Sequence, residues 1–247
     1  MEPMEGQFRG KRALVTGAAK RVGRAIALAL GSAGAEVAVH YRSSRTEAER
    51  TAAELVALGV RAPLVQGDQA REPERIVAGA VAGLGGLDLL VCSAARFEKM
   101  PSEALSRDAF DGMLAANLTG PFFLMQAALP HLRAARGAIV NLVDLCGTEQ
   151  VWKGHAHYAA SKAGLATLTR LLALEWAPEV RVNAVAPGSV LFPEEMGEQE
   201  KARIVRRIPL RRAGTPQDVA RAVLFLLGEP FISGQVLAVD GGRSVAP

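Results

Sequence analysis

The sequence predicts an α/β fold, a doubly wound parallel sheet of about seven strands with helices on both faces. Short β-branched runs alternate with Ala- and Leu-rich stretches of helix length, the order that gives parallel strands joined by right-handed crossovers. Most of these runs are apolar on successive residues, as in strands covered on both faces. A glycine-containing turn, TGAAKRVG at 16–23, follows the first run directly, which is typical of a Rossmann-type sheet.

Local patterns define each expected element. The strands are the β-branched runs, and the helices are the longer stretches with apolar residues at helical spacing. Pro73 is expected in the first turn of the third helix, where a missing N–H costs nothing. In chain order we expect strands at 12–16, 36–41, 61–66, 87–92, 138–143, 180–186 and 235–240, and helices at 22–33, 46–58, 72–83, 106–135, 157–177 and 216–227.

The chain is expected to form one domain spanning 1–247, because no Pro/Gly/Ser-rich linker, internal repeat or low-complexity tract interrupts it. The exception to this regularity is a polar segment at 187–215, bracketed by prolines, between the sixth strand and the last helix. Such an insertion is either plain surface or a loop that covers a substrate. If it is a substrate loop, we expect it at about 189–212.

Composition narrows the class of protein. The chain has 49% apolar residues, 29 basic and 25 acidic side chains and a net charge of +4 spread along its length, which favours an anionic small ligand over nucleic acid. No stretch reads as a signal peptide, and apolar runs such as AIALAL are too short to cross a bilayer, so we expect a cytoplasmic protein. Cys92 and Cys146 lack CxxC or metal-like spacing, so neither a disulfide framework nor a metal site is expected.

The turn after the first strand is a candidate phosphate site. Gly17 would allow the tight turn, and Gly23 would let the following helix approach the sheet. The second strand ends His40-Tyr41-Arg42-Ser43 without a carboxylate, whereas NAD-selective proteins place an acidic residue there. Arg42 and Ser43 offer donors to a 2′-phosphate, so NADPH is the expected cofactor; the alternative is a solvated basic turn.

Tyr158 and Lys162 are a candidate acid pair. Their i,i+4 spacing places them on one face of the helix that follows the fifth strand. A nearby ammonium would lower the pKa of the phenol from about 10 towards working pH. The sequence therefore predicts a proton donor at the edge of the sheet where the glycine turn lies.

Taken together, these pieces resemble the short-chain dehydrogenase/reductase family over nearly the whole chain. The motifs are TGAAKRVG, Ala94-Ala95 after strand LLVC, Asn117 in NLTGPFF, YAASK, RVNAVAPG ending at Gly188, and VDGG at 239–242. The resemblance implies hydride transfer between nicotinamide and a carbonyl or imine, and commonly a homotetramer. It implies an acid role for Tyr158, a ribose contact for Lys162, a relay water held by Asn117, an adenine contact for Asp68, and further cofactor contacts at Val22, His40, Tyr41, Ala94, Pro187, Gly188 and Ser189.

Departures from the family pattern indicate a subfamily. Most members have Ser where Asp144 stands, and a carboxylate there would repel the oxyanion of a ketone reduction. Most members also have Gly at the position of Arg21. The combination of TGAAKR, HYRS, Phe97 and Asp144 is similar to pteridine reductases, in which the matching arginine reaches cofactor phosphate and pterin and the matching aromatic stacks on the pterin. Asp144, with Tyr158, would then relay a proton to a ring nitrogen.

Three points stay open in the sequence. The stretch from Asp144 to Tyr158 is one residue longer than is usual in the family, so the acid could point elsewhere. Ala95 and Arg96 replace small polar residues common in the pteridine enzymes. Trp152, His155 and His157 either line the substrate pocket or lie in a surface loop. Ser189 either contacts cofactor or substrate or only stabilises its own turn.

The expected function is NADPH-dependent reduction of a pterin such as dihydrobiopterin or dihydrofolate. The first alternative is a general carbonyl or 3-oxoacyl-thioester reductase. The second alternative, from another class, is a redox sensor that binds NADPH without turnover.

Overall fold

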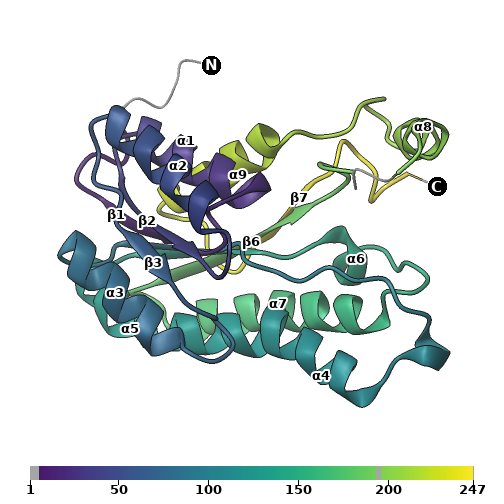
Figure 1. Ribbon diagram of the computed structural model, residues 1–247, viewed down its shortest axis with the longest axis horizontal. Coiled ribbons are helices and arrows are strands. Elements are labelled where there is room, and N and C mark those ends of the chain that lie inside the picture. The colour runs from purple at the N-terminus through teal and green to yellow at the C-terminus, as the bar shows by residue number, and fades with distance from the viewer. Residues whose placement is uncertain (1–5, 193–195, 247) are drawn as a thin grey trace.

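Seven parallel strands form one twisted sheet in the order β3-β2-β1-β4-β5-β6-β7. The computed structural model describes residues 6–192 and 196–246 (Figure 1). The strands are β1 (Arg12–Val15), β2 (Glu36–Tyr41), β3 (Leu64–Gln66), β4 (Leu89–Cys92), β5 (Ala138–Leu142), β6 (Arg181–Pro187) and β7 (Val236–Val239). The predicted fold class is confirmed.

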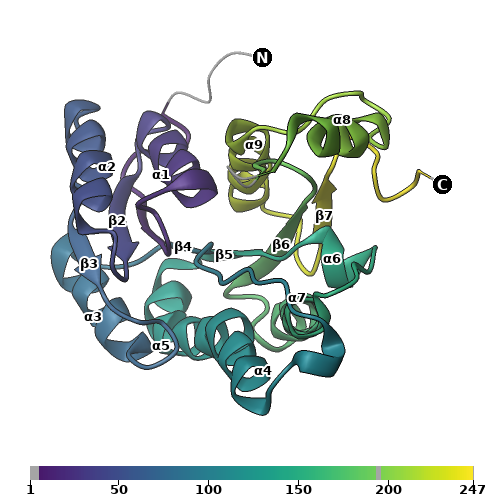
Figure 2. The same cartoon turned by 45° about the vertical axis from the view of Figure 1, so that its right-hand side comes forward.

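Helices cover both faces of the sheet, as Figures 1 and 2 show. One layer contains α1 (Arg21–Ser32), α2 (Arg45–Ala57) and α9 (Pro216–Gly228), which share a buried apolar cluster with the sheet. The other contains α3 (Pro73–Leu84), α5 (Gly120–Ala135) and α7 (Ala156–Glu175), with α4 (Arg107–Leu114) packed beside α7. Shorter elements are η1 (Ser102–Ala104), η2 (Ala115–Thr119), α6 (Leu145–Thr148) and α8 (Glu198–Arg206).

The chain reverses its winding direction at β1, which pairs with β2 on one side and β4 on the other. At such a point the loops after neighbouring strands diverge to opposite faces and leave a crevice at the carboxyl ends of the strands. The glycine turn after β1, the turns after β2 and β3, and the segment after β4 all lie at this edge. Most of the sequence-predicted site residues are therefore brought to one edge of the sheet.

Two predicted segments differ in detail. The stretch expected as one helix at 106–135 is divided by η2, a π-helical turn that contains Asn117. The segment expected as a polar loop carries the amphipathic helix α8, whose first turn is acidic and whose last turn is basic, as the helix dipole favours. Residues 193–195 of the expected substrate loop lie outside the described residues.

One helical stretch in the described residues, Arg107–Ala135, is long and apolar enough to cross a membrane by composition alone. Its apolar residues have another role in this fold, because Leu124, Met125, Ala128 and Leu132 are fully buried in the core beneath the sheet. The stretch is therefore a core helix of the α/β fold.

Candidate active site

The glycine turn after β1 is closely packed against the neighbouring strand end. Gly17 has a φ of +65°, and a Cβ on it would lie 3.0 Å from the Cα of Ala94. A Cβ on Gly23 would lie 2.3 Å from the carbonyl oxygen of Gly17. The Thr16 hydroxyl fixes the turn to the end of β4 by accepting bonds from the N–H groups of Ser93 and Ala94 at 3.0 and 2.9 Å. Both glycines are therefore required by close backbone approach, as the sequence predicts.

Replacing Gly23 by alanine should raise the Kd for the nicotinamide cofactor by about tenfold or more, because a one-ångström displacement at a binding turn is costly. The Cβ cannot be accommodated unless the Gly17 peptide moves. Gly197→Ala is the matched control, since no atom of the described residues lies within 4 Å of a Cβ there. Fluorescence titration of both variants measures the effect; equal affinities would contradict the assignment of the turn.

Arg21 and Val22 begin α1 directly after the turn. Arg21 has a φ of +54°, a left-handed conformation that glycine adopts without strain, which explains why glycine is usual at this position in the resembling family. Its side chain is exposed, whereas Val22 is half-buried against the core. The predicted contacts of its guanidinium with cofactor phosphate and substrate remain predictions.

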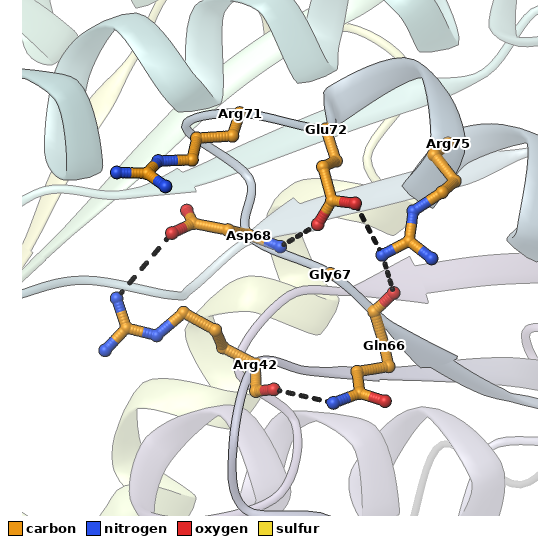
Figure 3. Close-up of a pocket in the computed structure, with 7 residues that line it drawn as sticks. All are labelled: Arg42, Gln66, Gly67, Asp68, Arg71, Glu72 and Arg75. Carbon is orange, nitrogen blue, oxygen red and sulfur yellow. Dashed lines mark hydrogen bonds and ion pairs between the residues drawn. The ribbon is translucent and has the colours of Figure 1, made fainter.

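A polar cavity of about 330 Å³ lies where β2 and β3 end (Figure 3). Arg42 is exposed, and its guanidinium lies 3.9 Å from the carboxylate of Asp68. Figure 3 shows this carboxylate directed to the space between the guanidinium groups of Arg42 and Arg71. The lining residues are Arg42, Gln66, Gly67, Asp68, Arg71, Glu72 and Arg75.

The cations in this cavity outnumber the anions. Glu72 pairs with Arg75 at 2.7 Å and also accepts the Asp68 N–H at 3.1 Å. Asp68 pairs only loosely with Arg42, and no acidic partner of Arg71 is found in 6–192 or 196–246. The cavity therefore suits a ligand that brings negative charge.

The side chains of Tyr158 and Asp144 are joined by a direct hydrogen bond. Tyr158 lies in the first turn of α7, Asp144 follows β5, and the phenol donates to the Asp144 Oδ2 at 2.8 Å. The other carboxylate oxygen accepts the Cys146 N–H at 2.7 Å. In the loop around α6, between the two residues, Gly147 adopts a φ of +98° against the Ala159 carbonyl. The open question of register is thus resolved: Asp144 points to Tyr158.

The pKa of Tyr158 is shifted in the direction opposite to the one expected from the sequence. Burial, and then the neighbouring Asp144, raises the pKa of Tyr158 well above 10. Lys162 was expected to lower that pKa, but its ammonium donates to the Leu142 carbonyl at 2.7 Å and lies 5.8 Å from the phenol ring centre. Burial lowers the pKa of Lys162 to about 8 and raises that of Asp144. The expected direction of the phenol shift is therefore wrong, and Tyr158 holds its proton.

Asn117 is buried in the π-helical turn beside this cluster. Its amide oxygen accepts the Arg96 N–H at 2.8 Å, and its amide nitrogen donates to the Arg96 carbonyl at 2.9 Å and lies 3.3 Å from the Ser161 hydroxyl. Asn117 thus fixes the segment after β4. Its predicted part in a proton relay remains a prediction, although π-helical turns often occur at functional sites.

Aromatic side chains form a wall above Tyr158. The rings of Phe97 and Tyr158 are nearly perpendicular, with centroids 4.8 Å apart, and Phe97 stacks on His155 at 5.0 Å. Trp152 lies against His155 at 6.0 Å. His155 and His157 are buried, so the surface-loop alternative does not describe them, whereas Phe97 is 55% exposed. Phe97 is therefore accessible from solvent beside Tyr158, with one face of its ring covered by His155.

The opposite side of the crevice is formed by the end of β6. Pro187 closes the strand, the Gly188 N–H bonds the Val239 carbonyl at 3.0 Å, and a Cβ on Gly188 would lie 2.8 Å from the Asp240 Cβ. Ser189 accepts the Gly214 N–H through its backbone carbonyl. The predicted contact of its hydroxyl with cofactor or substrate remains a prediction.

Sequence reasoning missed two residues that hold the site together. Thr16 is described above, and a buried threonine at a strand end is a signal that could have found it. Gln69 donates from one amide nitrogen to the carbonyls of Ala94 and Ala116, at 3.0 and 2.8 Å, and so links the segment after β4 to the π-helical turn. This bond joins residues far apart in the sequence, so no local pattern predicts it.

Comparison with known proteins decides the family. The model of a family described as enoyl-(acyl carrier protein) reductase matches residues 17–244. The chain belongs to the short-chain dehydrogenase/reductase family. It is 36% identical to glucose 1-dehydrogenase from Gluconobacter oxydans, covering 98% of this chain and 95% of that protein. It is 35% identical to the 3-oxoacyl-[acyl-carrier-protein] reductase FabG from Staphylococcus epidermidis, covering 94% and 98%.

Solved structures agree with this family assignment. A protein from Sinorhizobium meliloti 1021, assigned as a short-chain alcohol dehydrogenase, superposes with a TM-score of 0.92 at 36% identity and covers 99% of this chain and 100% of its own. Members of the short-chain dehydrogenase/reductase family are oxidoreductases that use a nicotinamide cofactor. The resemblance read from the motifs is confirmed at the level of the family, and the comparisons do not support the pteridine subtype.

The residues present fit that cofactor. The crowding at Gly17 and Gly23 leaves a backbone turn that side chains cannot enter, which is what a pyrophosphate requires. Gly17, Gly23, Ala94 and Gly188 would hold the dinucleotide, with Arg42 and Asp68 at its adenosine end. When bound, the nicotinamide supplies or accepts a hydride. The described residues contain no group of three or more His, Cys, Asp or Glu side chains that could hold a metal ion.

Proposed function

We propose that this oxidoreductase uses NADPH to reduce a ring C=N bond of a pterin-like heterocycle. The observation that carries the proposal is the 2.8 Å bond from the Tyr158 hydroxyl to Asp144. Reduction of C=N needs a proton at nitrogen, and Tyr158 holds one beside a carboxylate that can pass on a replacement. The proton from Tyr158 neutralises the nitrogen as the hydride reaches carbon, so no anion builds up beside the Asp144 carboxylate.

The surroundings of the pair support a flat substrate. Phe97 is 55% exposed and lies beside Tyr158, and a planar heterocycle would stack on an aromatic ring with a favourable quadrupole arrangement. Arg21, exposed at the start of α1, would bind the polar edge of the ring or a cofactor phosphate, as the pteridine resemblance implies. Asp144 and Lys162 compensate each other's buried charge.

The choice of NADPH rests on Arg42 and Ser43, which are exposed where β2 ends, and on the unbalanced cation at Arg71. Replacing Arg42 by alanine should raise the KM for NADPH by about ten- to a hundredfold and leave that for NADH within about twofold, since a charge-assisted bond to the 2′-phosphate is lost. Arg75→Ala is the control, because Arg75 is already paired with Glu72. Equal effects on both cofactors would argue for a solvated basic turn.

A second candidate is reduction of a 3-oxoacyl thioester or another carbonyl, and the relatives favour it, because one is named as such a reductase and another as a glucose dehydrogenase. The geometry allows it if Asp144 is protonated and donates to the carbonyl oxygen, as a neutral carboxyl in an apolar site can. Burial raises the pKa of Asp144, which moves it in that direction. Carbonyl activity should then increase as the pH falls.

The proposal also covers the oligomeric state and the cellular location of the protein. We propose that one catalytic domain, 1–247, acts as a cytoplasmic homotetramer and that residues 189–212 serve as its substrate loop. Exposed Leu171 and Leu174 on α7 are consistent with helix-to-helix packing between subunits. Light scattering in solution gives the oligomer size directly.

One assay separates the candidate functions. NADPH consumption is measured with biopterin, dihydrobiopterin and dihydrofolate beside an acetoacetyl thioester and a quinone. Turnover of the pterins supports the first candidate, and turnover confined to the thioester replaces it with the second. Quenching of NADPH fluorescence without oxidation by any substrate would instead indicate a sensor that binds the cofactor without turnover.

A further inference from the structure

His40 is buried within β2 at a place where two loops of the cofactor site meet. Its side chain is 2% exposed. The Nδ1 atom lies 3.2 Å from the Gly17 amide nitrogen, and the Nε2 atom lies 3.1 Å from the Gly67 carbonyl oxygen. The imidazole therefore lies between the glycine turn after β1 and the turn after β3 that leads to Asp68.

These two contacts fix the proton on the ring. An amide N–H can only donate, so Nδ1 must be the acceptor, and a carbonyl can only accept, so Nε2 must carry hydrogen. The ring is then the neutral Nε2–H tautomer. Burial supports this state by lowering the pKa of His40 to about 4, against a smaller opposing effect of the Gly67 bond and the nearby Asp68 charge.

The backbone of the same strand end contacts both turns as well. The His40 carbonyl accepts the Ala18 N–H at 2.9 Å, and the Tyr41 carbonyl accepts the Gly67 N–H at 3.0 Å. The imidazole adds a direct bridge between the two turns, which backbone bonds alone do not supply. Both of its nitrogen atoms are occupied by this bridge, so a polar contact of the ring with the cofactor is not available.

We infer that His40 is a positioning residue, which as a neutral imidazole bonds the glycine turn to the Gly67 turn and holds the pyrophosphate and adenosine ends of the cofactor site in register. This role replaces the direct cofactor contact expected from the sequence. It does not depend on the substrate or on the choice between NADPH and NADH, because both share the pyrophosphate and the adenine. It requires only the nicotinamide cofactor of the family.

The tautomer is measured first, on the cofactor-free protein. Long-range ¹H–¹⁵N NMR spectra of ¹⁵N-histidine-labelled protein distinguish the two neutral tautomers and the imidazolium, and the His40 signal is assigned by its loss in His40→Gln. We expect the neutral Nε2–H form at neutral pH. An Nδ1–H tautomer or an imidazolium would overturn the inference without bearing on the substrate proposal.

Cofactor affinity is measured next. His40→Leu keeps the approximate volume but leaves the Gly17 N–H and the Gly67 carbonyl unpaired, so the Kd for NADPH and for NADH should rise together by about tenfold. His40→Gln can donate and accept, and should recover most of the affinity. Val39→Ala removes a fully buried side chain from the neighbouring position of β2, and should lower the melting temperature with unchanged Kd.

The variants separate positioning from a purely structural role. A folded His40→Leu protein with wild-type Kd for both cofactors would overturn the inference, as would equal losses in His40→Gln and His40→Leu. If His40→Leu does not fold, the tautomer seen in the NMR spectrum of the wild-type protein still decides the matter.

Discussion

Replacing Tyr158 by phenylalanine should reduce turnover of the reducible substrate by about 10²- to 10⁴-fold, the range expected for loss of a positioned proton donor. Tyr158 keeps its proton because burial and Asp144 raise its pKa well above 10, and phenylalanine removes that proton while filling the same space. Steady-state NADPH oxidation measures the loss.

The control for Tyr158→Phe is cofactor binding, which should change little because the ring packing against Phe97 is preserved. Fluorescence titration with NADPH provides that measurement. Retained turnover, within about tenfold of the wild-type rate, would show that another group delivers the proton and would remove the basis of the proposed mechanism.

Replacing Asp144 by alanine should reduce pterin turnover by about two orders of magnitude or more, as loss of a proton relay should. Asp144→Asn keeps the shape and a hydrogen bond to Tyr158 but cannot carry the proton, so it should lose nearly as much. Both variants should bind NADPH normally, which distinguishes a chemical defect from a collapsed site. Unchanged pterin turnover in Asp144→Asn would contradict a relay role.

The fold was predictable because its signals are local. Runs such as EVAVHY are apolar on successive residues, and the alternation with helix-length stretches requires parallel strands. Strand ends were less predictable: of the run expected at 61–66, only Leu64–Gln66 forms strand β3, although the carbonyls of Arg61 and Pro63 still accept bonds from β2. The division of the 106–135 helix by η2 depends on tertiary contacts around Asn117.

Site residues were predictable from the sequence where a short motif requires a particular residue type. The sequence indicates a turn at Gly17 and Gly23 and an acid pair at Tyr158 and Lys162. The structure places all four residues at one edge of the sheet. The direction of the pKa shift of Tyr158 was not predictable, because it depends on where the Lys162 ammonium points. The bridge made by His40 joins three separate strand ends, so only the assembled fold reveals it.

The role we propose for Asp144, in the place of the usual serine, is to direct this reductase to C=N rather than C=O bonds. The most direct test compares wild type and Asp144→Ser for NADPH-dependent reduction of dihydrobiopterin and an acetoacetyl thioester in one experiment. We predict that wild type prefers the pterin and that Asp144→Ser loses pterin turnover and gains thioester turnover. A wild-type protein that reduces the thioester faster than the pterin, with Asp144→Ser unchanged in preference, would contradict that role.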